Sequence, residues 1–277
     1  MVHSNCHTHT VFCDGKNTPE EMVQSAVDKG FSCLGFSFHS PMKDHAFWTI
    51  RPEKLPAYTA EIHRLQAAYA DKIEILHGVE LDSNYTLPDP AAFDYVIASV
   101  HQLTDGTRFC DVDDSAEKLL ACCVNWFGGD WLALAAQYYE TLSAFVTDVR
   151  PTVVGHYDLI EKFNENGVLF DSLDPRYLEI AKRHIDRILV HCPDVLFEVN
   201  TGAMYRCGKA QPYPAPPLLR YLCEKGAKVI VTSDSHNTAS LDFAFDTALD
   251  CIRSAGFREV WELRRVDGKA VARATAV

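Results

Sequence analysis

The chain has 277 residues, 47% of them hydrophobic, and a formal net charge of −12. This length and composition suit one large buried core, so we expect a single domain over residues 1–277. The acidic balance, without any run of Lys and Arg, argues against a nucleic-acid partner, because nucleic-acid-binding proteins usually carry a basic face.

The sequence shows no pattern of a secretion signal or a membrane span. The start, Met1-Val2-His3-Ser4, lacks a basic segment followed by an apolar one, and no apolar run approaches the ~18 residues of a spanning helix. We therefore expect a soluble, cytoplasmic protein without a membrane partner. Its ten cysteines are scattered without a CxxC pair, which indicates buried, reduced thiols rather than a disulfide framework.

Strands and helices alternate along the first hundred residues. After a first strand, Thr18 as N-cap, Pro19 at the first helical position and Glu21 in a capping box predict a helix. Gly30 ends it. Apolar runs and helical periodicity then predict strands over 31–38, 73–79 and 95–100 and a helix over 52–70.

A long interruption divides this first half from the second. Residues 102–130 contain several aspartates and the pair Gly128-Gly129, which predicts a mobile loop with a short helix, a candidate lid. Beyond it we expect helices over 131–147, 176–191 and 240–255, strands over 152–154, 195–199 and 228–232, and a hairpin over 260–271 with an Asp267-Gly268 turn.

The predicted strands end in residues that can bind a metal ion. His7 and His9 are one residue apart in an extended segment, so their imidazoles should point to the same side. Alone, such a pair is more often ordinary surface or core histidines. The same position recurs, however, after the later strands, at His39, Glu80, His101, His156 and Asp234 with His236.

Seven β/α units in series, with short connections, predict a parallel sheet closed into a barrel. In such a barrel, functional residues gather at the carboxyl ends of the strands. If the polar residues above were merely satisfied core groups, they would be scattered over both ends. Their placement therefore predicts one common site.

The order and spacing of these motifs resemble the polymerase-and-histidinol-phosphatase (PHP) family, and more narrowly its free-standing histidinol-phosphate phosphatases. The motifs are HxHT-x3-DG from His7, SxHS around His39, GVE ending at Glu80, SVH ending at His101, GHxDL around His156 and SDSH ending at His236. Residues 200–206 and Tyr213-Pro214 also resemble the histidinol-phosphatase branch. The resemblance implies an α/β fold, a distorted (β/α)7 barrel.

The resemblance also implies three metal positions. One ion would be held by His7, His9 and Asp234, a second by His101 and His156 with Glu80 as the bridge, and a third by Asp14, His39 and His236. Many family members have a histidine where this chain has Asp14, so the sequence follows a variant pattern with a carboxylate at the third position.

Such a site has a clear chemical preference. Three divalent ions bring +6 against −3 from Asp14, Glu80 and Asp234, so the pocket should attract a phosphate dianion. Imidazole and carboxylate ligands without thiolate suit zinc, iron or manganese. A metal-bridging hydroxide held via Glu80, His9 and Asp234 would attack phosphorus in line. We expect Arg206 to bind a phosphate oxygen through its planar guanidinium.

We therefore predict a metal-dependent phosphomonoesterase with two to three transition-metal ions that hydrolyses L-histidinol phosphate, a small-molecule substrate, in histidine biosynthesis. One alternative is a phosphoesterase of other substrate range, such as an oligonucleotide exonuclease or nucleotide phosphatase. Another is a non-catalytic metal-binding module.

Residues outside the matched set receive simpler interpretations. Asp158 either orients a ligand imidazole or is a solvated loop carboxylate. Cys6 and Cys13 are predicted to be packing thiols. The remaining histidines are expected at the surface or behind the ligands: His3, His45, His63, His77, His184 and His191.

Overall fold

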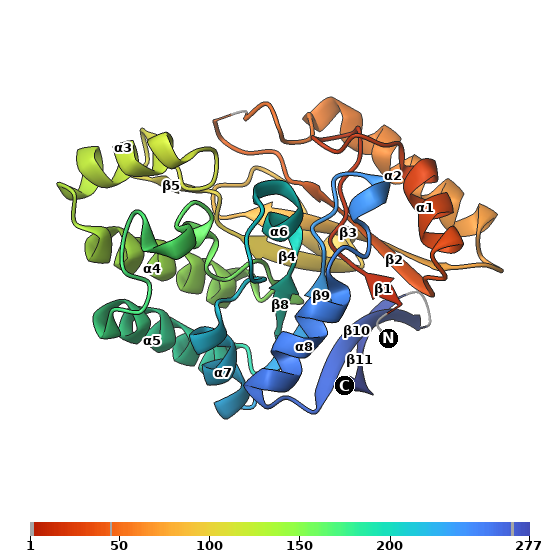
Figure 1. Ribbon diagram of the computed structural model, residues 1–277. Helices are drawn as coiled ribbons and strands as arrows, with labels where there is room; N and C mark the ends of the chain where they lie inside the picture. Colours follow the sequence, from red (N-terminus) through yellow and green to blue (C-terminus); the bar gives the residue numbers. More distant parts are fainter. Residues whose placement is uncertain (1–2, 45, 267–268) are drawn as a thin grey trace.

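Seven parallel strands form the centre of the computed structural model, which describes residues 3–44, 46–266 and 269–277 (Figure 1). In hydrogen-bonded order they are β1 (Ser4–Asn5), β2 (Cys33–His39), β3 (Glu74–Asp82), β4 (Tyr95–Ser99), β7 (Val153–Val154), β8 (Leu196–Asn200) and β9 (Lys228–Thr232). The sheet curls until its two ends meet. Thr8, just after β1, pairs with Ser235, just after β9, and the His9 N–H donates to the Ser235 carbonyl at 2.8 Å.

The predicted seven-unit barrel is therefore confirmed. It is distorted because, among the residues that the structure describes, β1 and β9 share no ladder of backbone hydrogen bonds and are joined by the bridge at the carboxyl-terminal rim and by side-chain contacts of Asn5 with Ser233. Each predicted strand from 31–38 onward appears within three residues of its expected bounds.

Most of the described helices cover the outside of the curled sheet, and the short helix at 202–207 lies at its carboxyl-terminal rim (Figure 1). The helices are α1 (Pro19–Asp28), α2 (Leu55–Ala68), α3 (Ala116–Phe127), α4 (Trp131–Val149), α5 (Pro175–His191), α6 (Gly202–Cys207), α7 (Pro216–Glu224) and α8 (Phe245–Ala255). The capping box of α1 forms as predicted: the Glu21 N–H donates to the Thr18 hydroxyl, and the Glu21 carboxylate accepts from the Thr18 N–H at 2.8 Å. Helices α6 and α7 were not predicted, and α8 begins five residues later than expected.

The amino-terminal end of the barrel is filled. The predicted hairpin is present as β10 (Glu259–Val266) and β11 (Lys269–Ala276), paired antiparallel, while its Asp267-Gly268 turn lies outside the described residues. Leu263 of β10 joins an apolar cluster with side chains of six barrel strands and with Cys6, which confirms Cys6 as a packing thiol. The carboxyl-terminal end is therefore the end at which a site can open.

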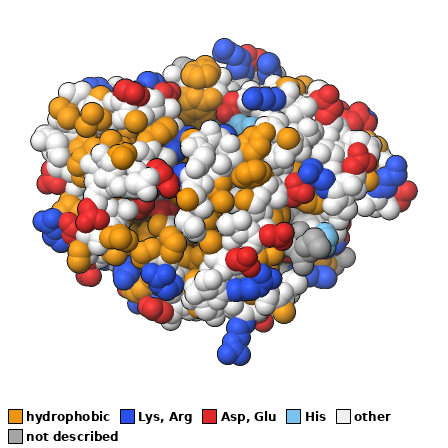
Figure 2. Space-filling model, viewed as in Figure 1, with side chains coloured by type: hydrophobic (Ala, Val, Ile, Leu, Met, Phe, Trp, Pro, Cys, Tyr) orange, Lys and Arg blue, Asp and Glu red, His pale blue; other side chains and the backbone are white. Residues whose placement is uncertain are grey.

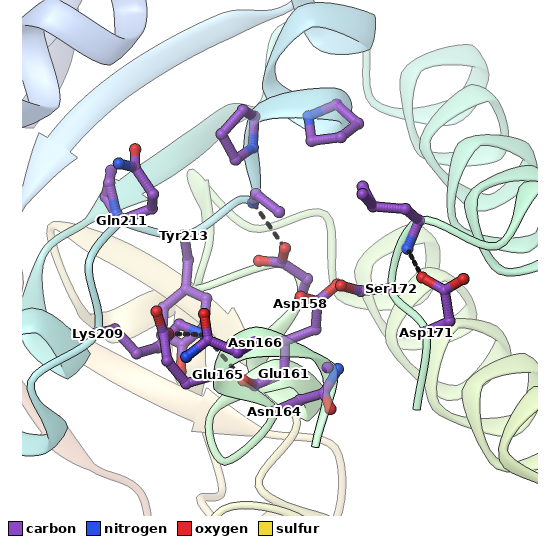
Figure 3. A pocket seen from close by; sticks show the side chains of 16 residues that line it. Asp158, Glu161, Asn164, Glu165, Asn166, Asp171, Ser172, Lys209, Gln211 and Tyr213 are labelled. Carbon is purple, nitrogen blue, oxygen red and sulfur yellow. Dashed lines mark hydrogen bonds and ion pairs between the residues drawn. The ribbon is translucent and has the colours of Figure 1, made fainter. Parts of the chain in front are cut away.

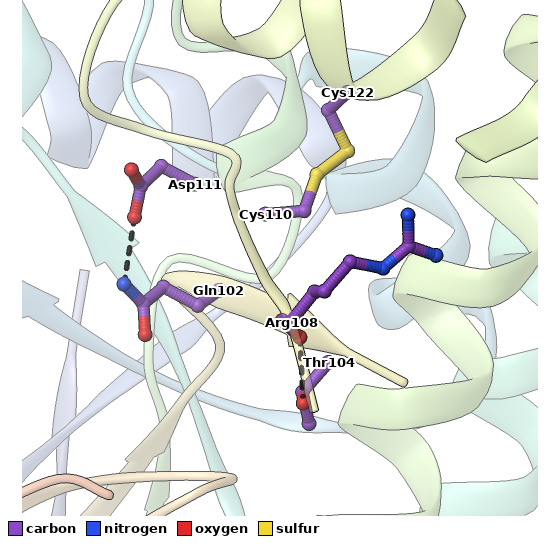
Figure 4. The surroundings of a disulfide bond; sticks show 6 residues. All are labelled: Gln102, Thr104, Arg108, Cys110, Asp111 and Cys122. Atoms are coloured by element: carbon purple, nitrogen blue, oxygen red, sulfur yellow. Dashed lines mark hydrogen bonds between the residues drawn. A yellow bond between two sulfur atoms is a disulfide. The ribbon is translucent and has the colours of Figure 1, made fainter. Parts of the chain in front are cut away.

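The predicted loop over 102–130 is more ordered than expected. Strands β5 (Gln102–Thr104) and β6 (Phe109–Asp111) form a small antiparallel hairpin that leads into α3. Cys110 of β6 and Cys122 of α3 form a disulfide (Figure 4). The expectation of reduced cysteines is therefore wrong for this pair, because the hairpin folds back against α3 and brings two residues that are 12 apart in sequence into contact.

Two further expectations from the composition concern the surface charge and the membrane-spanning potential of the helices. On the face shown in Figure 2, Lys and Arg are interspersed with Asp and Glu rather than gathered into one patch. Among the described residues, no single helix is long and apolar enough to cross a membrane; α3 and α4 reach that length and composition only as a pair bent by 97°.

Candidate metal centre

All nine predicted metal ligands converge at the carboxyl-terminal rim of the barrel. His39 is the last residue of β2, Glu80 lies near the end of β3, and the others follow β1, β4, β7 and β9. Eight of the nine are mostly enclosed by protein, and Asp14 is more open, with a side chain 30% exposed. Because parallel strands end at the same edge of a sheet, residues far apart in sequence meet there.

The ligand atoms of the first predicted group, those of His7, His9 and Asp234, lie close to one another. The Nε2 atoms of His7 and His9 lie 3.2 and 3.5 Å from Glu80 Oε2, and 3.5 and 3.2 Å from Asp234 Oδ1. The two imidazoles face the same side, as predicted, with ring centroids 5.1 Å apart. Four ligand atoms from three strand ends thus face a common space.

Glu80 reaches the second group through its other oxygen. Its Oε1 lies 3.0 Å from His156 Nε2 and 3.4 Å from His101 Nε2. His39 Nδ1 also lies 2.8 Å from Glu80 Oε2. This carboxylate therefore stands between the two groups, the position expected of a bridging ligand.

In the third group, Asp14 lies between two histidines. One of its oxygens is 3.1 Å from His236 Nε2 and the other is 3.7 Å from His39 Nε2. His9 Nδ1 is 3.8 Å from the same carboxylate, so His9 lies between the first and third groups. The loop can turn this tightly because position 15 is glycine: a Cβ there would lie 2.4 Å from the backbone nitrogen of Thr10.

The donor set fits divalent metal ions. The Nε2 atoms of His7 and His9 and Oε2 of Glu80 are buried and have no hydrogen-bond partner among the described residues. Burial would raise the pKa of the Glu80 and Asp234 carboxyl groups, but neighbouring histidines, and Arg206 beside Asp234, lower both pKa values well below the ordinary range. Ionised carboxylates and imidazole nitrogens suit zinc, iron or manganese.

Two carboxylates that the sequence analysis missed hold the ligand histidines in place. Glu198 Oε1 lies 2.6 Å from His7 Nδ1, and its Oε2 accepts the backbone N–H of His156 at 2.9 Å. Asp82 Oδ2 lies 3.1 Å from His101 Nδ1. Such contacts fix the orientation of an imidazole and present its other nitrogen to a metal. The signal in the sequence was a single acid in an apolar strand, at Glu198, and an acid two residues after Glu80.

Three smaller expectations have different outcomes. Asp158 is fully buried, so its interpretation as a solvated loop carboxylate is wrong; its Oδ2 accepts the backbone N–H of Ala215 at 2.7 Å. Cys13 is not only a packing thiol, because its Sγ lies 3.6 Å from His9 Nδ1. His45 lies outside the described residues.

Arg206 lies beside the centre and contacts a predicted ligand directly. Its Nη2 donates to Asp234 Oδ2 at 2.6 Å and its Nη1 to the Asp234 carbonyl at 2.7 Å. Asp234 has a left-handed backbone, with φ of +46°, a conformation that costs about 1–3 kcal/mol. Gly202 permits this approach, because a Cβ there would lie 2.9 Å from Cβ of Asp234. Arg206 thus supports Asp234 in a strained position.

A cavity of about 270 Å³ opens above the ligands. Its floor includes predicted ligands from all three groups, together with Arg206. Its lining also includes Phe47 and Trp48, three aspartates at positions 111, 113 and 114, and Lys162. The lining is therefore polar at the ligands and mixed elsewhere.

A second cavity of about 410 Å³ lies behind the 3₁₀ turn Leu159–Glu161 (Figure 3). Asp158 and Glu161 line it, whereas Leu159 and Lys162 of the same segment line the cavity over the ligands. Burial raises the pKa of Asp158 to about 6, and burial together with the nearby Asp158 carboxylate raises that of Glu161 to about 8.

Replacing Glu161 by glutamine should stabilise the protein in a pH-dependent way. Because the folded-state pKa of Glu161 is above its ordinary 4.5, folding favours the protonated acid, and this residue destabilises the protein as pH rises from 4.5 to 8. At pH 8.5 we expect Glu161→Gln to raise the free energy of unfolding by at least about 1 kcal/mol, or about 2–4 °C in midpoint. Thermal unfolding at pH 5 and pH 8.5 measures this.

The exposed Glu179 supplies the control, since Glu179→Gln should shift neither midpoint. An equal stabilisation by Glu161→Gln at both pH values would contradict the raised pKa.

Comparison with known proteins identifies the family of this chain. The family model described as the PHP domain matches residues 4–202. The chain belongs to the PHP domain family. This PHP chain is 32% identical over 271 residues to the "Probable histidinol-phosphatase" of Deinococcus radiodurans, covering 92% of this chain and 94% of that protein.

Solved structures share the fold. A structure from Listeria monocytogenes matches with a TM-score of 0.71 at 21% identity, over 88% of this PHP chain and 99% of that one. The histidinol phosphate phosphatase of Lactococcus lactis, complexed with zinc, L-histidinol and phosphate, matches with a TM-score of 0.62 at 23% identity, over 97% and 98% of the two chains. The barrel architecture described above is thus the fold of this family.

Proposed function

We propose that this PHP chain is a metal-dependent phosphomonoesterase that hydrolyses L-histidinol phosphate to L-histidinol and phosphate, a step of histidine biosynthesis. The observation that carries the proposal is the convergence of six histidines and three carboxylates at the open end of the barrel, with five of the histidines in contact with Glu80. The Deinococcus radiodurans relative, which aligns over almost the whole chain, supports the same reaction. We propose that residues 1–277 act as one domain.

We further propose two to three divalent ions of zinc, iron or manganese, held in the three groups described above. When bound, the ions supply positive charge that stabilises the phosphoryl oxygens and acidifies the attacking water. Glu80 and Asp234 partly neutralise that charge, and Glu198 and Asp82 keep the Nε2 atoms of His7 and His101 directed into the site.

The substrate phosphate would lie on the floor of the cavity, against Arg206. The planar guanidinium of this residue matches phosphate geometry.

Replacing Arg206 by alanine should raise KM for the phosphomonoester about tenfold or more, the effect of losing a charged hydrogen bond of about 1.5–3 kcal/mol. Because Arg206 also donates to Asp234, we expect weaker metal binding at the first group as well. Steady-state kinetics at saturating metal separates the two effects. An unchanged KM under that condition would exclude phosphate binding by Arg206.

The proposed function is tested with three substrates. Metal-reconstituted protein is incubated with L-histidinol phosphate, a single-stranded oligonucleotide and an aryl phosphate, and released phosphate or nucleotide is measured for the wild type and His9→Ala. Preferred turnover of L-histidinol phosphate that His9→Ala abolishes is the expected result. Shortening of the oligonucleotide, or no turnover of any substrate, would replace the proposal with one of its alternatives.

A further inference from the structure

The lining of the cavity over the metal centre has two chemically different sets of side chains besides the ligands. Phe47 and Trp48 are the aromatic residues of its lining, and Trp48 stands edge-on to His39 with ring centroids 4.7 Å apart. Phe47 is 87% exposed, an unusual setting for a large apolar side chain. The lining also carries Asp111 of β6 and, in the loop that follows, two further aspartates.

Two of these three aspartates are already engaged. Asp111 accepts from Gln102 Nε2 at 2.7 Å through one oxygen and from Lys118 Nζ at 2.9 Å through the other (Figure 4 shows the Gln102 contact). Asp114 accepts from the same lysine at 3.1 Å and is 40% exposed. Asp111 therefore has a donor on each oxygen, and Asp114 is largely open to solvent.

Asp113 differs from both neighbours. Its side chain is only 24% exposed, and its Oδ1 has no hydrogen bond among the described residues. Lys162 Nζ donates to the Asp113 carbonyl at 2.7 Å and only at 3.3 Å to Oδ2. The lysine therefore holds the backbone of this residue more closely than its carboxylate, which can still accept a donor.

We propose that Asp113 is the residue that recognises the ammonium group of the substrate. This inference rests on the proposed function, because L-histidinol phosphate carries a phosphate, a primary ammonium and an imidazole ring. With the phosphate near the predicted metal ligands, a carboxylate in the cavity lining matches the ammonium, and the aromatic side chains Phe47 and Trp48 of the same lining match the planar ring.

The charges at the mouth support this assignment. Three carboxylates lie here against two lysines: Lys118, which Asp111 and Asp114 share, and Lys162. The remaining negative charge favours a positively charged group in this part of the cavity. An aryl or alkyl phosphate without an amine would leave Asp113 partly enclosed without its second donor. The site would then bind such a substrate less well, since an enclosed charged group without a partner costs free energy.

The test compares L-histidinol phosphate with its deamino analogue, the phosphate ester of 3-(imidazol-4-yl)propan-1-ol. The wild type should prefer the amine-bearing ester by about 10- to 100-fold in kcat/KM, the range expected for one charged hydrogen bond. Asp113→Asn should remove most of that preference, by lowering kcat/KM for the amine-bearing ester alone. Bound metal should be unchanged.

Asp114→Asn is the matched control, one residue away in the same loop, and should retain the preference. Equilibrium binding of L-histidinol and of the deamino alcohol to metal-loaded protein gives a second readout that needs no turnover. There, Asp113→Asn should weaken L-histidinol binding by the same factor and leave the deamino alcohol unaffected.

The outcomes separate the two proposals. If the wild type hydrolyses neither imidazole ester but cleaves another phosphoester, the proposed function fails, and the binding comparison still decides whether Asp113 recognises an amine. If the wild type hydrolyses both esters equally, or Asp113→Asn weakens both to the same extent, the assignment of Asp113 is overturned and the proposed function is not.

Discussion

Replacing Glu80 by glutamine is expected to abolish catalysis, with a loss of at least about 1,000-fold in kcat/KM. Both oxygens of Glu80 face ligand histidines, so a neutral amide with one acceptor cannot serve both groups. Bound metal ions contribute several kcal/mol to phosphoryl transfer, and each 1.36 kcal/mol is a factor of ten in rate. Elemental analysis of the purified variant should show at least one metal ion fewer per chain than the wild type.

The same strand offers a matched control. Glu74 is the first residue of β3, at the opposite end from Glu80, and its carboxylate accepts from Arg264 on β10. Glu74→Gln should therefore affect stability modestly while leaving metal content and kcat/KM near wild-type values. Retention of full metal content and activity by Glu80→Gln would remove Glu80 from the centre.

Replacing Glu198 by glutamine is expected to weaken metal binding by about 10- to 100-fold, the usual effect of losing a residue that orients a ligand. The carboxylate is fully buried and accepts from three sides: His7 Nδ1, the backbone N–H of His156 and Asn200 Nδ2 at 3.0 Å. An amide presents a donor where one of these contacts needs an acceptor. Activity should fall at limiting metal and recover in large part when metal is added in excess.

Rescue by metal distinguishes a positioning role from general disruption of the fold. The exposed Glu179 again provides a control, because Glu179→Gln should not change the metal dependence of the activity. A loss of activity in Glu198→Gln that excess metal does not restore, with unchanged metal content, would show that Glu198 acts on the reaction in another way.

The order of the strands and the residues at the carboxyl-terminal rim could be predicted, because both depend on local sequence patterns. Apolar runs of strand length, separated by helical periodicity, require parallel strands, and parallel strands bring their carboxyl ends to one edge. His39, Glu80 and His101 could therefore be placed together from the sequence alone. Helix α6 could not be predicted, because it is six residues long and lies in a loop closed by a β-bridge between Asn200 and Tyr213 that no local pattern indicates.

By itself, the sequence determined the barrel class and which side chains reach its open end, since these follow from strand period and chain order. Only the tertiary structure decided which groups hold those side chains: Glu198 meets His7 across 191 residues, and Arg206 meets Asp234 across 28. It also joined Cys110 to Cys122 and, within the part of the chain that the structure describes, left Oδ1 of Asp113 without a hydrogen bond in the cavity lining. The physical reason is that such contacts depend on how the curled sheet closes and how its loops fold over the rim, and no spacing within one segment encodes that closure.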